Sequence, residues 1–383
     1  MNINFNLGAA YLQNEQYKEA IDSFLKAVES NPNDSDSWFA LGFSYGGDEQ
    51  YKKGIEALLK AKELNPDNSK IDEILESLYL EQGKSNFENE QYIEAIDSLL
   101  KAIEINPENS DTWGILGCSY YGDNQYRESI DSFLKVSKLK PDAIDHFALY
   151  MLGDSYQQIG EYEKAIYSLL KAIEISSEDS DSWAVLGISY LKNNQYEEAK
   201  NSFLKAVELN PNNDYCWVRL GYLYDKKKQY KEAKECYLKA VELNPNDENM
   251  NSLGDIYGKN GQYKEAIDIL LKATQLNAYN DINWRLLGLA YKKNEQYEES
   301  IKALLKAVEL NPNSYINWRL LGSSYGKNSQ IDKAIEFLLK ATELNPNDSE
   351  SLRLLGVAYT QAGRHKDAIK VYQKLKNLSS NNE

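Results

Sequence analysis

NEQYKEAIDSFLKAVESNPND, residues Asn14 to Asp34, returns almost unchanged as NEQYEESIKALLKAVELNPNS from Asn294 to Ser314. Three further versions lie between these two: QYIEAIDSLLKAIEINPEN, QYEEAKNSFLKAVELNPNN and QYKEAKECYLKAVELNPND. Self-similarity at a fixed period is typical of repeat arrays, in which each unit buries its apolar face by stacking on its neighbours. The sequence therefore predicts a solenoid built from tandem units.

A few positions that hardly vary between the copies give the register of the units. Glycine recurs at position 8 of every unit, all six tryptophans fall at position 4, and all eight prolines fall at position 32. Tyrosine fills position 11 in ten units. This register gives eleven units, most of them 34 residues long, which cover residues 1–382 as a single array without a linker. The units start at residues 1, 35, 76, 110, 146, 180, 214, 247, 281, 315 and 349.

Each unit contains two stretches in which apolar or small residues follow helical spacing. The first stretch uses positions 4, 7, 8 and 11, and the second uses positions 20, 21, 24, 25, 27 and 28, which predicts two amphipathic helices. Proline at position 32 ends the second helix, because proline cannot extend a helix and the residue before it favours extended geometry. Small residues at positions 8, 20 and 27 predict a close approach of the two helices.

Seven additional residues, SKIDEIL at 69–75, precede the third unit. Seven residues are close to two turns of an α-helix. We therefore expect this insertion to lengthen the first helix of the third unit without rotating its buried face. A shorter insertion, Ile144 and Asp145, precedes the fifth unit.

The composite pattern W-x2-LG-x2-Y, then A-x3-[FL]-x2-A, then P, resembles the tetratricopeptide repeat, and the resemblance covers almost the whole chain. It implies an all-α fold: a right-handed superhelical solenoid of antiparallel helix pairs. It also implies a concave groove, lined by the first helix of each unit, that binds partner proteins.

Charge and composition limit the classes of partner and location. The net charge is −16, and residues 1–179 hold 33 acidic against 15 basic residues, whereas residues 180–383 hold 26 against 28. An acidic chain argues against a nucleic-acid partner, whose phosphates require basic groups. Three scattered cysteines indicate a reducing compartment. No stretch has the length and apolarity of a membrane span, so we expect no membrane contact and a cytoplasmic location.

No arrangement of residues in the sequence is typical of catalysis. The two histidines, His146 and His365, lie in distant units, and neither has partners at metal-ligand spacing. Phosphate-binding glycine loops, HExxH and GxSxG are absent. The sequence therefore predicts a protein that is not an enzyme and needs neither a metal nor a cofactor.

The candidate binding residues lie on the face of each first helix that packing does not use. If positions 4, 7, 8 and 11 are buried, positions 5, 9, 12 and 13 share the neighbouring face, which the resemblance assigns to the groove. The aromatic candidates on this face are Phe5, Phe39, Phe43, Tyr121 and Tyr150. The basic candidates are Arg285, Arg319 and Arg353 at position 5 and Lys192, Lys226, Lys259, Lys293 and Lys327 at position 13.

Each candidate set also has a structural alternative. A lysine at position 13 lies in the last turn of its helix, where a cation offsets the exposed carbonyl groups, and we favour this interpretation for the lysines. The aromatic residues equally fit packing against the next unit. Arginine at one groove position of three consecutive units favours recognition of carboxylate or phosphate.

Two hypotheses of function follow. The first is a non-catalytic scaffold that holds a protein or peptide segment in the groove, with acidic or phosphorylated residues of that segment on the three arginines. The alternative is a structural protein that self-assembles head to tail through exposed terminal units, aided by the different charges of its two halves.

Overall fold

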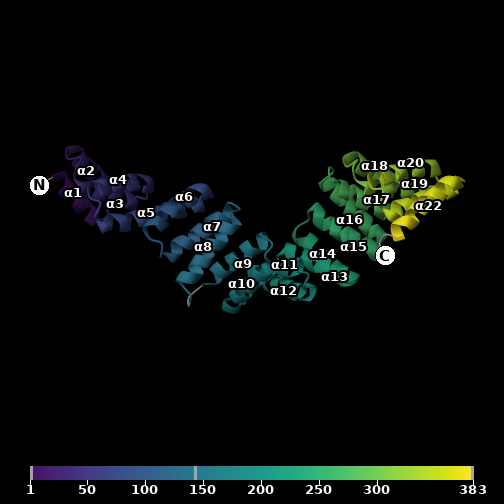
Figure 1. Cartoon of the computed structure of the whole chain (residues 1–383), viewed down its shortest axis with the longest axis horizontal. Coiled ribbons are helices and arrows are strands. Elements are labelled where there is room, and N and C mark those ends of the chain that lie inside the picture. The colour runs from purple at the N-terminus through teal and green to yellow at the C-terminus, as the bar shows by residue number, and fades with distance from the viewer. Residues whose placement is uncertain (1–2, 142–144, 381–383) are drawn as a thin grey trace. The chain divides into compact units, whose positions relative to one another are not determined.

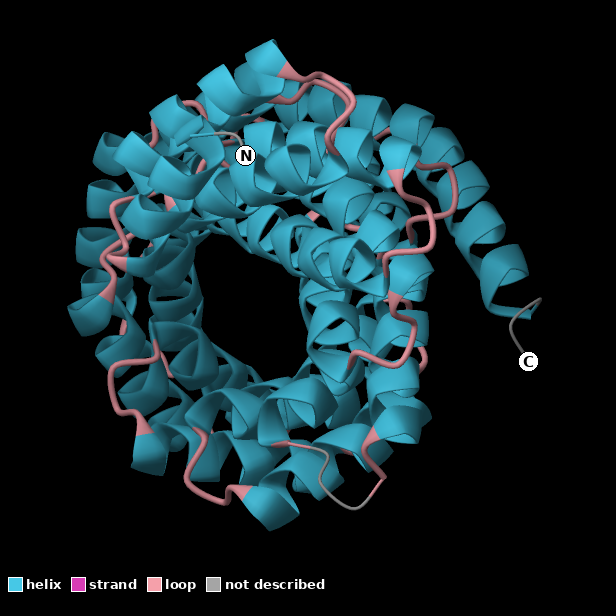
Figure 2. Cartoon of the chain, turned by 90° about the vertical axis from the view of Figure 1, so that its left-hand side faces the viewer, coloured by secondary structure: helices cyan, strands magenta, loops and turns pink. Residues whose placement is uncertain are grey.

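The computed structural model describes residues 3–141 and 145–380, and within these ranges the chain consists of α-helices joined by short loops, without a strand (Figures 1 and 2). The helices alternate between a first helix (odd numbers) and a second helix (even numbers) of each unit. The bounds are α1 Ile3–Gln13, α2 Tyr17–Ser30, α3 Ser35–Gly47, α4 Tyr51–Leu64, α5 Ser69–Glu88, α6 Tyr92–Ile105, α7 Ser110–Gly122, α8 Tyr126–Leu139, α9 His146–Gln158, α10 Tyr162–Ile175, α11 Ser180–Lys192, α12 Tyr196–Leu209, α13 Asp214–Lys226, α14 Tyr230–Leu243, α15 Asp247–Lys259, α16 Tyr263–Leu276, α17 Asp281–Lys293, α18 Tyr297–Leu310, α19 Tyr315–Lys327, α20 Ile331–Leu344, α21 Ser349–Gln361 and α22 His365–Ser380.

The helix boundaries follow the spacing of the predicted units. The first helices of nine units begin at the predicted unit start, the described part of α1 begins at Ile3, and the lengthened α5 begins at Ser69. Side chains cap several of these starts, as when Asp179 accepts a hydrogen bond from the Ser182 amide and Asn213 from the Cys216 amide. The insertion lies inside α5, which is 20 residues long and buries Ile71 and Leu75. The insertion thus lengthens a first helix, as expected.

Tight packing explains the glycine at position 8. A Cβ added to Gly288 would lie 2.5 Å from Cγ of Leu304, and one added to Gly117 would lie 2.8 Å from the ring of Phe133. Both partners are buried residues at position 24 of the same unit. The two helices of a unit can therefore approach this closely only where the first helix lacks a side chain.

The turn between the two helices has a feature that the sequence pattern did not indicate. Position 15 of every unit adopts a left-handed backbone with φ between 57° and 81°. Glycine fills this position in only three units, at Gly160, Gly261 and Gly363, and the other eight units use Glu, Asn, Lys or Ser. The left-handed residue reverses the chain within one turn.

The tryptophans at position 4 are half-buried rather than fully buried. Each donates its indole N–H to a backbone carbonyl six residues earlier, in the loop that precedes its helix, as Trp38 does to Pro32 (2.8 Å) and Trp318 does to Pro312 (2.7 Å). The indole thus packs with its apolar ring while its N–H fixes the loop between units.

Three buried asparagines join consecutive units in the second part of the chain. Asn249, Asn283 and Asn317 occupy position 3 and are at most 5% exposed. Asn283 Nδ2 lies 3.0 Å from the Ala273 carbonyl and 2.9 Å from the Asn277 carbonyl, at the end of α16. The amide therefore adds a second donor to two carbonyl groups at the helix end, each of which also accepts a backbone N–H.

We predict that Asn283→Ala lowers the free energy of unfolding by about 1–2 kcal/mol, because the hydrogen bonds from its buried amide to Asp247 and to the two carbonyl groups are lost. Urea unfolding followed by tryptophan fluorescence measures the change. Tyr279→Ala in the same loop is the control, since Tyr279 is 88% exposed and its loss should leave the midpoint unchanged. Equal midpoints for the two variants would contradict this role of Asn283.

The contacts divide the chain into two compact units that are larger than the repeats, residues 1–199 and 200–383. Each has its own buried clusters, among them Phe24 with Leu41 in the first and Leu304 with Leu321 in the second. The prediction of one continuous solenoid over residues 1–382 stays a prediction.

Candidate functional site

The aromatic candidates lie in the unit of residues 1–199, and four of the five are half-buried. Phe5 packs edge-on against Phe24 of the same repeat, with ring centroids 5.6 Å apart. Phe39 packs against a buried cluster that includes Leu58 and Ile71. Phe43 is 41% exposed. Packing therefore explains Phe5 and Phe39, and Phe43 is the aromatic candidate most open to solvent.

Tyr121 and Tyr150 surround a buried acid. The Tyr121 hydroxyl donates to Oδ2 of Asp154 at 2.7 Å, and Asp154 is only 8% exposed. Burial raises the pKa of Asp154, although the hydrogen bond from Tyr121 acts in the opposite direction. Burial and the nearby charge of Asp154 raise the pKa of Tyr150. Tyr121 therefore holds this carboxyl group in place within residues 1–199.

The five candidate lysines all lie in the last turn of a first helix, where a cation offsets the exposed carbonyl groups of the helix end. Lys259 forms two ion pairs within the protein, since its Nζ lies 2.6 Å from Asp225 and 2.8 Å from Asp255. Lys226 lies over the ring of Tyr222, 5.5 Å from its centroid. Lys192, Lys293 and Lys327 are exposed and pair with no carboxylate in the described ranges.

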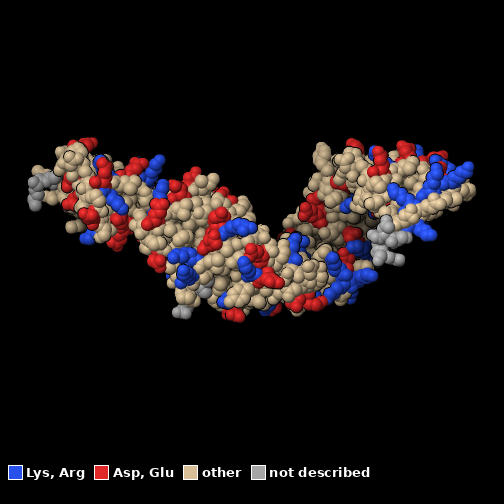
Figure 3. All heavy atoms as spheres, viewed as in Figure 1, with Lys and Arg blue, Asp and Glu red and all other residues tan. Residues whose placement is uncertain are grey.

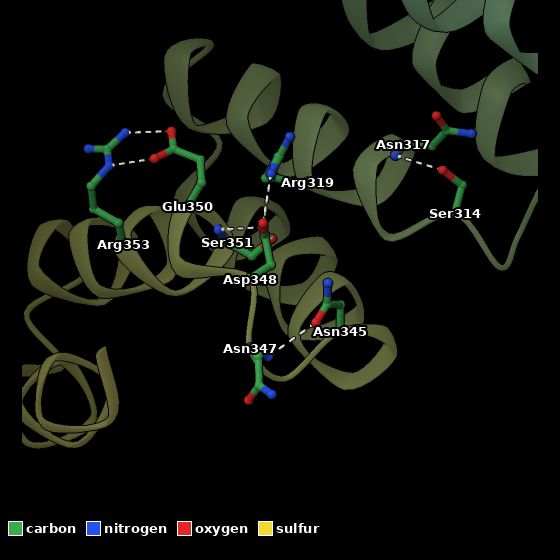
Figure 4. A network of polar contacts seen from close by, with 9 residues as sticks. All are labelled: Ser314, Asn317, Arg319, Asn345, Asn347, Asp348, Glu350, Ser351 and Arg353. Atoms are coloured by element: carbon green, nitrogen blue, oxygen red, sulfur yellow. Dashed lines mark hydrogen bonds and ion pairs between the residues drawn. The ribbon is translucent and has the colours of Figure 1, made fainter. Parts of the chain in front are cut away.

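Two of the three candidate arginines form ion pairs within the protein (Figure 4). Nη1 of Arg319 on α19 donates to both carboxylate oxygens of Asp348, at 2.9 and 3.0 Å, and Asp348 in turn caps α21, the first helix of the next repeat. Arg353 is exposed and donates twice to Glu350 of its own helix. Arg285 is half-buried and has no ion pair with a residue that the structure describes.

Asp348 is anchored from two sides. Besides Arg319, it accepts hydrogen bonds from the amide and hydroxyl groups of Ser351 (Figure 4). Burial alone would raise the pKa of Asp348, but these hydrogen bonds and the charge of Arg319 lower it. Arg319 uses only Nη1 for this contact, so its other N–H groups face no acceptor among the described residues.

Lys292, at position 12, is a candidate that sequence reasoning missed. It is half-buried on α17, and its Nζ lies 3.3 Å from Oγ of Ser323 on α19. Burial lowers the pKa of Lys292 to about 8, helped by the cations Lys293, Arg319 and Lys327, while Glu350 acts in the opposite direction. A half-buried ammonium group among like charges is unfavourable when no anion is bound to it. Groups with such shifted pKa values are typical of functional sites.

The two helices that carry this lysine hold an excess of positive charge. Helices α17 and α19 contain one carboxylate, Asp281, which accepts a hydrogen bond from Asn317. Against it stand five cations: Arg285, Lys292, Lys293, Arg319 and Lys327. Hereafter the basic face denotes these five residues. A second gathering of basic side chains covers α22 at the end of the chain (Figure 3).

Among the described residues, no group of three or more His, Cys, Asp or Glu side chains could hold a metal ion. Burial first, and then nearby acidic residues, raise the pKa of Cys118 and Cys236 to about 12, so neither is a reactive thiolate at neutral pH. No described helix combines the length and apolarity needed to cross a bilayer.

Several solved structures are similar to this chain. A chain of the APC/C heterotetramer Cut9–Hcn1 is 15% identical with a TM-score of 0.49, over 98% of this chain and 93% of that one. Yeast Tom70 is 17% identical with a TM-score of 0.42, over 98% and 91%. YrrB, described as a TPR protein with an unusual peptide-binding site, is 26% identical with a TM-score of 0.43, over 48% and 96%.

Sequence profiles of protein families also match. Profiles of the tetratricopeptide repeat match residues 3–34, 23–56, 76–109, 284–314 and 319–383. The profile of the C-terminal domain of cilia and flagella-associated protein 70 matches residues 115–287. No curated protein matches the chain. The repeat profiles, together with the 22 helices in tandem pairs among the described residues, show that the chain belongs to the tetratricopeptide repeat family.

Proposed function

We propose that this protein is a non-catalytic scaffold that binds a segment of a partner protein on the first helices of its last repeats. Acidic or phosphorylated side chains of the segment contact Arg285, Arg319 and Arg353. The excess of cations on α17 and α19 supports this proposal most directly, because the two helices carry five cations and one carboxylate, and Asp348 pairs only with Arg319. Cations without counter-charges favour an acidic ligand through Coulomb attraction and faster association.

Arginine suits this role geometrically. Its planar guanidinium group donates two parallel hydrogen bonds to a carboxylate or phosphate. Arg285 has no acidic partner among the described residues, and Arg319 is held in one orientation by Asp348 while most of its N–H groups remain unused. A donor that is already oriented loses less conformational entropy when it binds.

The first experiment compares pull-downs from a native extract by the wild-type chain and by the variant Arg285→Gln, Arg319→Gln, Arg353→Gln. Glutamine avoids placing a new carboxylate beside Asp348. The same three positions changed to lysine form the control that keeps the charge. We expect partners, identified by mass spectrometry, to be depleted roughly tenfold with the glutamine variant and retained in part by the lysine variant. Equal recovery by all three proteins would overturn the assignment to these arginines.

Head-to-tail self-association is the second candidate function. The observation that favours it is the charge difference between residues 1–179, which hold 33 acidic against 15 basic residues, and residues 180–383, which hold 26 against 28. Electrostatic association of this kind weakens as salt screens the charges. Light scattering at low and high salt tests it: a mass that grows with concentration only at low salt supports assembly, and a constant monomer mass rejects it.

A further inference from the structure

A pocket of about 280 Å³ opens between α15, α16 and α17 in the unit of residues 200–383. Leu270, Leu286, Leu289 and Ala290 give it an apolar lining, and Asp255, Lys259 and Lys293 add charged groups. Pockets that hold drug-sized ligands measure roughly 300–1,000 Å³. A pocket below this range suits one amino-acid side chain.

The pocket depends on the glycine at position 12 of this repeat. A Cβ added to Gly258 would meet no heavy atom within 4 Å, so the space beside it is open. Several other repeats place a large side chain here, such as Tyr121 or Lys292. Two others have glycine, but a Cβ added to Gly46 would lie 2.6 Å from Leu78 and one added to Gly326 would lie 3.6 Å from Ala334. Gly258 is therefore the residue whose missing side chain leaves leucine surface accessible, and an apolar group that enters is removed from water.

One cation of α17, Lys293, borders the pocket. Asp255 is neutralised by Lys259, 2.8 Å away. Lys293 lines the pocket and has no ion pair with a described residue. Its neighbour Lys292 faces α19, where its Nζ lies 3.3 Å from Oγ of Ser323. A chain that crosses from α15 to α19 thus meets an apolar pocket and then two ammonium groups without counter-charges.

We propose that this surface binds one segment of a partner protein at two points. A large apolar side chain of the segment enters the pocket beside Gly258, and a neighbouring acidic side chain contacts Lys292 and Ser323. The inference rests on the proposed function and adds the composition of the segment. Charge complementarity favours this occupant, because an acidic group relieves the repulsion among Lys292, Lys293 and Arg319.

Peptide selection provides the probe. A displayed library of random 12-residue peptides is selected on the full chain, and the best binder is labelled with fluorescein for anisotropy at physiological salt. We expect the selected peptides to share a Leu, Ile, Met or Phe near an Asp or Glu. Peptides selected without an acidic residue, or no selection above background, would overturn the proposal. A phosphoserine version of the binder shows whether phosphate replaces the carboxylate at the same site.

The decisive variant fills the pocket. Gly258→Leu places a side chain in open space on a helix, so the fold should tolerate it. Gly114→Leu is the matched control, because Gly114 on α7 is also helical and also has open space around its missing Cβ. We expect Gly258→Leu to raise the Kd of the probe roughly tenfold or more, and Gly114→Leu to leave it unchanged. Wild-type affinity of Gly258→Leu would reject the pocket.

Variants of Lys292 test the second contact. We expect Lys292→Met to raise the Kd roughly tenfold, since a charged hydrogen bond is lost, and Lys292→Arg to retain most of the affinity. The wild-type affinity should fall as the pH rises from 7 to 9, through the Lys292 pKa of about 8, while Lys292→Arg should not respond. An identical pH profile for the wild type and Lys292→Arg would overturn the contact with Lys292.

The outcomes separate this inference from the proposed function. If the arginine variants lose partners while Gly258→Leu keeps them, the scaffold function stands and the two-point site is wrong. If light scattering shows that Gly258→Leu abolishes self-association instead, the occupant is a second copy of the chain, and the proposal of a partner segment is rejected.

Discussion

Replacing Lys292 by methionine should make the folded protein more stable at pH 7, by about 1–3 kcal/mol. Its pKa falls from an ordinary value of 10.5 to about 8 on folding, mainly because the ammonium group is buried among other cations. Such a shift means that the fold disfavours the charged form. Methionine fills a similar space without the charge. The same substitution is expected to weaken the acidic probe, so stability and binding should change in opposite directions.

The pH dependence has a defined sign. Below pH 8 the lysine is charged in both the folded and the unfolded protein, and its full cost is present. Between pH 8 and 10.5 the unfolded chain binds this proton and the folded protein does not, so the wild type gains stability as the pH rises. The advantage of Lys292→Met should therefore be smaller at pH 9.5 than at pH 7.

Urea unfolding at both pH values, followed by the fluorescence of the tryptophans, measures the effect. Lys293→Met is the matched control, because Lys293 is the exposed neighbour on the same helix and should change stability by less than about 0.5 kcal/mol. If Lys292→Met is less stable than the wild type at pH 7, the buried charge of Lys292 does not destabilise the fold.

Replacing Gly288 by valine should destabilise the fold by about 3 kcal/mol. A Cβ alone at this position would lie 2.5 Å from Cγ of Leu304, a fully buried side chain, and valine adds two further methyl groups. Such overpacking forces α17 and α18 apart or moves side chains away from their preferred rotamers.

A second glycine on the adjacent first helix provides the contrast. Gly258→Ala should stabilise the protein by about 0.5–1 kcal/mol, because its Cβ meets no atom within 4 Å and alanine favours a helix over glycine. Urea midpoints of both variants test the pair. If Gly288→Val is as stable as Gly258→Ala, helix packing does not require the glycine at position 8 of the repeat.

Most of the fold could be predicted from the sequence, because it depends on interactions within one repeat and its neighbours. Helical spacing, Gly288 opposite Leu304 and proline at position 32 all act over fewer than 34 residues. The insertion at 69–75 was correctly predicted to extend α5. The left-handed turn at position 15 was missed, since Glu295 and Lys228 adopt it as well as Gly261, and composition gives no signal where many residue types occupy the same backbone conformation.

The candidate site could be predicted only in part. The sequence by itself determined the repeat register, the helix pairs and the face on which Arg285, Arg319 and Lys293 lie. Only the tertiary structure decided that Arg319 is paired with Asp348, the residue that caps α21, that Lys292 is half-buried near Ser323, and that Gly258 opens a pocket. The physical reason is that helical periodicity fixes the direction of each side chain, whereas its charge environment and the empty space beside it depend on distances between repeats.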